Sequence, residues 1–329
     1  MNDTSHSNQQ NLYLFHSAMA SPSSTKVVHD FFPLFRVYED GRVERALEQV
    51  FTPPSDNPAT GVRSRDVVIV PEHNVRARLY LPKITGEDQK LPVLVYIHGG
   101  AFVLNSASSS MYDSYLHALT AKAKVLTVSV DYRLAPEHKL PACYDDSWAV
   151  FQWVASHAQG SGPGSDPWLK SHADLTRVFL AGDSAGGNIA HNMMVRAGGS
   201  GLKPAGMVLE HPYFGTGKPS KLWCLDWEKV WEYIYPESTG MDDPLHNPAA
   251  SPEILSGLVC SKIVVIISEK DIVREGGLKY YEALKKSGWG GKLELVDVEG
   301  EEHVFHLLNP TCEKAGSLMD RAVSFFNSL

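Results

Sequence analysis

The chain has few cysteines and no long apolar run. Its 329 residues include 4 cysteines, and no two of them form a C-x-x-C pair. Thiols this few and scattered are typical of a reducing compartment, and they favour neither a disulfide framework nor a zinc site built on cysteine pairs. Because no apolar stretch reaches about 18 residues, no membrane-spanning helix is expected. We therefore expect a cytoplasmic protein with no membrane partner.

Basic charge is also scarce. The 30 Lys and Arg residues are outnumbered by 38 Asp and Glu residues, which gives a formal net charge of −8, and the basic residues form no cluster or stripe. Nucleic acids and anionic membrane surfaces are therefore poor candidate partners. Hydrophobic residues make up 43% of the chain, which is enough to fill a sizeable core.

The N-terminal segment differs in composition from the rest of the chain. Residues 1–28 are rich in Ser, Asn and Gln, and Lys26 is the only Lys or Arg among them. The segment lacks the charged start and the long apolar stretch of a signal peptide. We expect residues 1–28 to form a flexible arm and residues 29–329 to form a single domain.

Strand-like and helical patterns alternate along most of the chain. Alternating units of this kind predict an α/β fold, in which helices cover both faces of a mostly parallel sheet. We expect eight strands, of which the last six are largely parallel. The strand-like runs lie near residues 66–71, 77–82, 91–97, 124–131, 176–181, 205–210, 262–267 and 293–298. The helical patterns lie near residues 107–122, 142–157, 185–197, 276–287 and 312–327.

A G-x-S-x-G pattern stands where a strand-like run gives way to a helical one. Gly182 and Gly186 flank Ser184 in this pattern. It is the sequence form of a nucleophile elbow, a turn so sharp that glycine is needed two residues before and two after the serine. Three fixed positions also occur by chance in Gly/Ser-rich turns, so the surrounding sequence has to decide. Ser184 is the candidate nucleophile.

A second glycine-rich turn follows a predicted strand and reads His98-Gly99-Gly100-Ala101-Phe102. When a serine attacks an ester, negative charge grows on the carbonyl oxygen, and backbone N–H groups held in a turn stabilise it. We assign this oxyanion hole to the N–H groups of Gly100, Ala101 and Ala185, with Gly99 shaping the turn. The alternative interpretation is an ordinary turn at a strand end.

The base and its orienting acid are expected at the same edge of the sheet as the serine. Asp271 and His303 each stand just past the carboxyl end of a predicted strand, and ligands of open α/β sheets bind at that edge. A serine, an acid and a histidine in this chain order can form a catalytic triad. Glu269 is an alternative acid and His306 an alternative base.

No metal or organic cofactor is expected. His303 and His306 form an H-x-x-H pair, but a zinc site needs three or four ligands, and no further His or Cys is close in sequence. The remaining histidines are interpreted as surface or capping residues. They include His138, His157, His172, His191 and His211.

A tryptophan-rich segment interrupts the alternation of strands and helices. Trp223, Trp227 and Trp231 recur every fourth residue, which predicts one face of a helix. Such a face packs on the core, or forms a lid wall against an apolar or aromatic substrate group, or does both. Phe102 and Val304 complete the expected substrate-binding residues. We expect residues of about 29–60 and 213–250 to form a cap over the active site.

These motifs together resemble one enzyme family, the plant carboxylesterases among the hormone-sensitive-lipase-like α/β hydrolases. The similarity extends from about Asp30 to the C-terminus, and residues 32–45 are similar to the subgroup that includes 2-hydroxyisoflavanone dehydratase. Where the family has a third glycine in the oxyanion turn, this chain has Ala101, which bears on the room for the acyl group. The matching motifs are HGGAF at 98–102, DYRLAPE at 131–137, GDSAGGN at 182–188, Asp271 and His303.

The resemblance implies an α/β-hydrolase fold and a serine carboxylesterase that acts on small apolar or aromatic esters through an acyl-enzyme. Members of the subgroup also perform other chemistry: isoflavanone dehydratases usually carry threonine at the nucleophile, and gibberellin receptors lack the histidine. This chain keeps Ser184, Asp271 and His303 together. Ester hydrolysis is therefore expected. A lyase or cyclase of plant specialised metabolism is the alternative, a non-catalytic receptor is less compatible, and a homodimer is left open.

Overall fold

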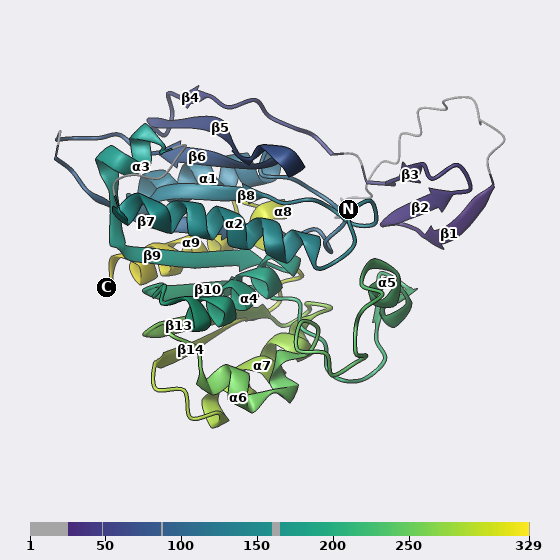
Figure 1. Ribbon diagram of the computed structural model, residues 1–329. Helices are drawn as coiled ribbons and strands as arrows, with labels where there is room; N and C mark the ends of the chain where they lie inside the picture. The colour runs from purple at the N-terminus through teal and green to yellow at the C-terminus, as the bar shows by residue number, and fades with distance from the viewer. Residues whose placement is uncertain (1–25, 48, 87, 160–164, 329) are drawn as a thin grey trace, which may run out of the picture.

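A large twisted sheet forms the centre of the computed structural model, which describes residues 26–47, 49–86, 88–159 and 165–328. Within these ranges the sheet has nine strands in the order β14-β13-β10-β9-β7-β8-β6-β5-β4 (Figure 1). The strands are β4 (Asp56–Asn57), β5 (Val62–Val70), β6 (Val75–Leu81), β7 (Leu91–Ile97), β8 (Leu126–Asp131), β9 (Ala173–Asp183), β10 (Gly206–Glu210), β13 (Lys262–Ser268) and β14 (Lys292–Val298).

Strand direction follows the prediction. The last six strands of this sheet, β7, β8, β9, β10, β13 and β14, pair with one another in parallel. Strands β4, β5 and β6 are antiparallel to their neighbours. The prediction of eight strands was one short, because Asp56–Asn57 adds a ninth at the edge. This strand could not be predicted because two polar residues show no alternation of apolar and polar side chains.

Helices cover both faces of the sheet. Alternate residues of a strand point to opposite faces, and in β7 Leu94 and Tyr96 belong to one apolar core while Val93 and Val95 belong to the other. The first core includes residues of α1 and α9, and the second includes residues of α2, α4 and α7. Figure 1 shows α2 and α4 in front of the sheet and α1 behind it. These helices are α1 (Ser110–Ala123), α2 (Ala142–Ser156), α4 (Ala185–Ser200), α7 (Arg274–Lys286) and α9 (Glu313–Asn327).

Shorter elements join these layers. None of the helices in the described ranges is long and apolar enough to cross a membrane. The short helices are η1 (Pro71–His73), η2 (His157–Gln159), α3 (Pro167–His172), η3 (Pro248–Ala250), α6 (Pro252–Ser256) and α8 (Phe305–Leu308).

Two further segments lie together beside the central sheet. The first is a three-stranded antiparallel sheet, and the second is a β-hairpin followed by helix α5 (Figure 1). Tyr233 of α5 joins them, because its ring lies 4.4 Å from that of His29 and 5.1 Å from that of Phe31, centroid to centroid. The elements are β1 (Val27–Phe31), β2 (Phe35–Tyr38), β3 (Val43–Glu44), β11 (Lys221–Leu222), β12 (Leu225–Asp226) and α5 (Trp227–Ile234).

The start of the folded chain differs slightly from the prediction. Strand β1 begins at Val27, two residues before the expected boundary, and the backbone N–H of Glu39 donates to the carbonyl of Lys26. The rest of the expected flexible arm, residues 1–25, lies outside the described residues.

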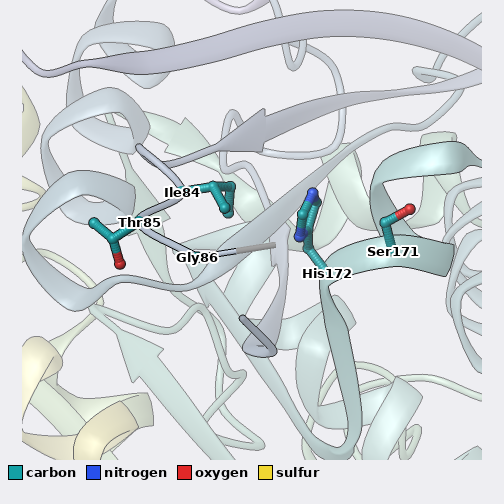
Figure 2. Close-up of a pocket in the computed structure, with 5 residues that line it drawn as sticks. All are labelled: Ile84, Thr85, Gly86, Ser171 and His172. Atoms are coloured by element: carbon teal, nitrogen blue, oxygen red, sulfur yellow. The ribbon is translucent and has the colours of Figure 1, made fainter. Parts of the chain in front are cut away.

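A shallow depression of about 480 Å³ lies at one edge of the sheet (Figure 2). Its lining segments, 84–86 and 171–172, come just before the starts of β7 and β9. The depression therefore lies at the amino-terminal edge of the parallel strands, opposite the carboxyl ends where ligands of α/β sheets bind.

Arg78 of β6 connects the antiparallel part of the sheet to helix α1. Its side chain is 2% exposed, and its guanidinium donates to both carboxylate oxygens of Asp66 at 2.7 and 2.9 Å and to Asp113 of α1 at 3.1 Å. Removing one partner of a buried ion pair leaves the other charge buried and unpaired. Arg76, two residues away, is 48% exposed and pairs with Asp131 at 3.2 Å.

We predict that Arg78→Leu lowers the free energy of unfolding by about 3–5 kcal/mol, because Asp113 then stays buried without its cation. The matched control Arg76→Leu should cost about 1 kcal/mol or less, since the Arg76 side chain is about half exposed and its carboxylate partner can reach solvent. Urea unfolding followed by tryptophan fluorescence measures both. Equal losses in the two variants would contradict this role for Arg78.

Candidate active site

Three side chains distant in sequence meet at the carboxyl edge of the sheet. Ser184 follows β9, Asp271 lies three residues beyond β13, and His303 lies five residues beyond β14. The distance from Ser184 Oγ to His303 Nε2 is 2.9 Å, and that from His303 Nδ1 to Asp271 Oδ1 is 2.8 Å. With its hydroxyl donating to Nε2, the serine faces a base whose other nitrogen faces a carboxylate. This is the geometry of an activated nucleophile.

The backbone of Ser184 is strained into a sharp turn. Its φ of +50° and ψ of −120° lie outside the regions that L-residues normally occupy, at a cost on the order of 1–3 kcal/mol. Two neighbours hold it there: its N–H donates to the carbonyl of Glu210 at 3.0 Å, and its carbonyl accepts the N–H of Tyr213 at 2.9 Å. The turn places the serine at the start of helix α4, where the helix dipole favours negative charge.

Gly186 makes this turn fit against strand β7. A Cβ atom at position 186 would lie 2.0 Å from the carbonyl oxygen of Ile97, the last residue of β7. Only glycine therefore allows α4 to start so close to the strand that leads into the oxyanion turn.

Asp271 is held as a carboxylate by hydrogen bonds. Its side chain is fully buried, which by itself raises the pKa. Hydrogen bonds from His211 and His303 and the N–H of Val273 outweigh burial and hold the pKa of Asp271 well below its usual range. The carboxylate therefore stays ionised at neutral pH, facing the imidazole of His303.

His211 is a buried neighbour of the triad that the sequence interpretation missed. It was expected at the surface or as a cap, but its side chain is 0% exposed and its Nδ1 lies 3.1 Å from Asp271 Oδ2. His191 is also buried, with Nδ1 3.0 Å from the hydroxyl of Tyr280. The one available signal was that His211 directly follows a predicted strand at the same edge as the triad. A single histidine after a strand does not indicate in the sequence which residue it contacts.

The two alternative triad members have other partners. Glu269 accepts the N–H of Gly300 at 2.7 Å on the exposed side of its loop. His306 is buried, with Nε2 3.7 Å from Glu210 Oε2. The H-x-x-H pair therefore does not act as a unit, because His303 and His306 face different carboxylates.

A different set of residues has the composition of a metal site. His211, Asp271 and His303 offer ligand atoms that all lie within 4.8 Å of one another. Three protein ligands match the minimum of a catalytic zinc site. In this arrangement each carboxylate oxygen of Asp271 already faces one imidazole nitrogen, which a hydrogen-bonded chain explains without an ion.

The oxyanion turn is anchored to the residue before the nucleophile. The N–H of Gly99 donates to Asp183 Oδ1 at 3.0 Å and to the hydroxyl of Tyr112 at 2.9 Å, so this group is engaged in holding the turn. Gly100 has a φ of +120°, which an L-residue rarely adopts, and Ala101 has a φ of +55°. Within the described parts of the chain, the N–H groups of Gly100, Ala101 and Ala185 have no hydrogen-bond acceptor. They are the groups that the sequence assigned as oxyanion donors.

The three tryptophans do not share one helix face. Helix α5 begins at Trp227, and Trp223 lies in the turn of the β11–β12 hairpin with a φ of +50°. The four-residue spacing predicted one helix face, but a hairpin turn before a helix can give the same spacing. Trp227 and Trp231 are buried, and the ring of Trp231 lies 5.8 Å from that of Phe102 in the oxyanion turn.

Packing against neighbouring side chains is therefore the observed role of the buried Trp227 and Trp231. Phe102 is 0% exposed, whereas Trp223 is 39% exposed and Val304 is half-buried. Contact of these residues with a substrate stays a prediction.

Comparison with known proteins places the chain in a family. The sequence profile of the family described as the alpha/beta hydrolase fold matches residues 94–307. The chain belongs to the α/β-hydrolase family. The matched range contains the oxyanion turn and all three triad residues, and it confirms the fold expected from the resemblance.

Curated relatives of this hydrolase are plant enzymes. It is 43% identical to 2-hydroxyisoflavanone dehydratase of Glycyrrhiza echinata, with 94% of this chain and 99% of that protein covered. It is 43% identical to probable carboxylesterase 13 of Arabidopsis thaliana, over 92% of this chain and 98% of that protein. It is also 43% identical to the chloroplastic tuliposide A-converting enzyme 2 of Tulipa gesneriana, over 94% and 82%. The resemblance to this plant group is confirmed.

Two solved structures similar to this hydrolase are an esterase and a carboxylesterase. The esterase of Pyrobaculum calidifontis superposes with a TM-score of 0.67 at 29% identity, covering 81% of this chain and 85% of that one. A thermostable carboxylesterase from a metagenomic library gives a TM-score of 0.68 at 28% identity, covering 86% and 90%.

We predict that Gly186→Ala lowers kcat/KM for an ester by about 100-fold or more, because the added Cβ displaces the elbow from Ile97 and a shift of about 1 Å is that costly. The control is Gly199→Ala near the end of the same helix, where a Cβ meets nothing within 4 Å. This control should retain activity and be slightly more stable, by about 0.4–1 kcal/mol. Steady-state kinetics and thermal unfolding test the pair. Normal activity in Gly186→Ala would refute the packing argument.

Proposed function

We propose that this α/β hydrolase is a serine carboxylesterase that cleaves small apolar or aromatic carboxylic esters. The observation that carries the proposal is the contact chain from Ser184 Oγ through His303 to Asp271, with distances of 2.9 and 2.8 Å. The names of the plant relatives and of the similar structures support the same reaction class.

The proposed reaction has two halves. His303 Nε2 takes the proton of Ser184 Oγ as the oxygen attacks the ester carbonyl, and the backbone N–H groups of Gly100, Ala101 and Ala185 stabilise the oxyanion. His303 then gives this proton to the leaving alcohol, which leaves an acyl group on Ser184. A water molecule, deprotonated by the same imidazole, releases the acid and restores the serine. Asp271 orients the imidazole and stabilises its cation.

The preference for apolar groups follows from the side chains near the oxyanion turn. Phe102 packs edge-on against Tyr213 and Trp231, so the turn carries an aromatic wall on one side. The cap that we propose over the site combines residues of about 29–60 and 213–250, which contact each other through Tyr233. Of the expected substrate-binding residues, Trp223 and Val304 keep exposed surface, which supports their proposed contact with the substrate.

Location in the cytoplasm and pairing into a homodimer also belong to this proposal. All four cysteines are free in the structure, which supports a reducing compartment. Some relatives have chloroplastic or mitochondrial names, so the fluorescently tagged full chain should be followed in plant cells. Light scattering on the purified protein gives the number of chains per particle.

We predict that the wild type hydrolyses p-nitrophenyl acetate and butyrate and that Ser184→Ala retains less than a few per cent of this activity, because no alkoxide can then form. A fluorophosphonate probe should label the wild type and leave the variant unlabelled. More than a few per cent of activity in Ser184→Ala would exclude this serine as the nucleophile. A wild type that neither turns over esters nor reacts with the probe would favour a receptor.

A second candidate reaction is elimination of water, which the similarity to a 2-hydroxyisoflavanone dehydratase favours. A base and an oxyanion hole can also remove a proton next to a carbonyl and expel hydroxide. This reaction needs the base and the oxyanion donors but not the nucleophile.

We predict that Ser184→Thr loses p-nitrophenyl ester hydrolysis, because a β-branched residue fits poorly at a φ of +50° and its extra methyl group crowds the attacking oxygen. If elimination is the physiological reaction, the same variant keeps or gains dehydration of a 2-hydroxyisoflavanone, measured by product chromatography. If the wild type and the variant both lack this dehydration, the protein is not a 2-hydroxyisoflavanone dehydratase.

A further inference from the structure

His211 is a buried titratable residue that the reaction described above does not use. It stands directly after β10, and its backbone N–H donates to the carbonyl of Ile266 in β13 at 2.8 Å. Its φ of +48° is in the left-handed region, which directs the chain away from the strand path. The side chain is 0% exposed and reaches the triad from the neighbouring strand.

The contact is with the carboxylate oxygen that His303 does not face. Nδ1 of His211 lies 3.1 Å from Asp271 Oδ2, whereas Nδ1 of His303 lies 2.8 Å from Oδ1, which also accepts the N–H of Val273 at 2.9 Å. Among the residues that the structure describes, His211 provides the hydrogen bond to Asp271 Oδ2. The two oxygens of one carboxylate are thus divided between two imidazoles.

Burial favours the neutral form of His211, and a neutral imidazole can donate to this carboxylate. Burial lowers the pKa of His211 to about 4, although the hydrogen bond with Asp271 acts in the opposite direction. A neutral imidazole carries one proton, and the nitrogen that faces a carboxylate oxygen is the one that holds it. We assign the proton to Nδ1 on this basis.

The ring of His211 is fixed from several sides. His306 stacks on it with centroids 5.4 Å apart and planes 12° apart, and Phe305 meets it edge-on at 5.7 Å. The ring of His303 also meets it edge-on, at 6.0 Å. The titratable groups around His211 are therefore Asp271, His303, His306 and the buried carboxylate of Glu210, which His306 also faces.

We propose that His211 is a positioning residue of the hydrolase, which donates its Nδ1 proton to Asp271 Oδ2 and so keeps Oδ1 directed at His303. This inference rests on the proposed esterase function. A carboxylate fixed through one oxygen can rotate, and a buried oxygen without a donor carries a large desolvation penalty. The second imidazole removes both problems without approaching the substrate.

Three variants distinguish loss of the His211 hydrogen bond from loss of its imidazole ring. His211→Leu and His211→Gly both remove the donor, and the glycine variant does so without backbone strain at a positive φ. His211→Asn keeps an N–H donor at the position of Nδ1, and asparagine tolerates the left-handed region. Because all three change the same site, the comparison among them isolates the hydrogen bond.

With p-nitrophenyl butyrate, we expect the Leu and Gly variants to lose about 10- to 100-fold in kcat with little change in KM, as for loss of a hydrogen bond to a charged group. The acid limb of their kcat/KM profile should move to higher pH. Without the donor, the carboxylate of Asp271 binds a proton more readily, and its protonation removes the group that orients the base. His211→Asn should recover most of kcat and the wild-type acid limb.

Several results of these measurements would contradict a positioning role for His211. Leu and Gly variants with wild-type kcat and an unmoved acid limb would overturn it, and so would an Asn variant as impaired as the Leu variant. A kcat loss with an unmoved limb would indicate a merely structural role. Activity lost on treatment with 1,10-phenanthroline and restored by Zn²⁺ would instead make His211 a metal ligand.

The tautomer of His211 can be measured without turnover, and therefore independently of the esterase activity. In wild-type protein labelled with ¹⁵N-histidine, NMR should show His211 as the Nδ1–H tautomer, and His211→Leu should shift the resonance of the His303 Nδ1 proton. An Nε2–H tautomer would overturn the proposal even in an active enzyme. If the wild type shows no serine-dependent hydrolysis, the proposed function fails, while the tautomer still decides whether His211 donates.

Discussion

The close approach of helix α4 to strand β7 is the constraint on which the site depends. Gly186 lies so near the carbonyl of Ile97 that any Cβ would overlap it, and this contact sets where the helix begins. Ser184 precedes that helix and the oxyanion turn follows that strand, so one contact fixes the distance between nucleophile and oxyanion donors. The strain at Ser184 persists because Glu210 at the end of β10 accepts its N–H and Tyr213, in the loop that follows, donates to its carbonyl.

A buried network of hydrogen bonds around Asp183 also holds the nucleophile and the oxyanion turn in place. Asp183 accepts hydrogen bonds from Gly99 and from Tyr112, so the residue before the nucleophile also holds the oxyanion turn. Burial raises the pKa of Asp183 to about 6 despite the nearby His306. Tyr96 lies between this carboxylate and that of Glu210, 3.1 Å from each. Buried polar groups that are satisfied in this way give a site a single arrangement.

Much of this architecture could be read from the sequence because it depends on local patterns. Strand β7 is apolar at all seven positions and β13 at nearly all, so their periodicity and length were unambiguous. The elbow glycines mark a turn that few other residues permit. Asp271 and His303 were found because each follows a predicted strand, apolar throughout most of β13 and alternating in β14. The resemblance to a known family then indicated the role that each residue is predicted to have.

The rest depends on contacts that no local pattern encodes. His211 meets Asp271 across 60 residues of chain, and nothing near position 211 names that partner. The engagement of the Gly99 N–H by Asp183 is likewise a contact between two motifs, invisible in either alone. Trp223 was misplaced because residue spacing cannot distinguish a hairpin turn from the first turn of a helix. Tertiary packing decided these cases.

The contact between Phe102 and Trp231 links parts of the molecule that have different tasks. Phe102 belongs to the turn that supplies oxyanion donors, Trp231 belongs to α5, and their rings pack edge-on. An outward movement of α5 would withdraw support from a turn in which Ala101 and Phe102 already occupy left-handed conformations. In the cap that we propose, opening a path for the reactant and displacing the oxyanion donors would thus be one movement, so that full reactivity returns only when Trp231 packs against Phe102 again.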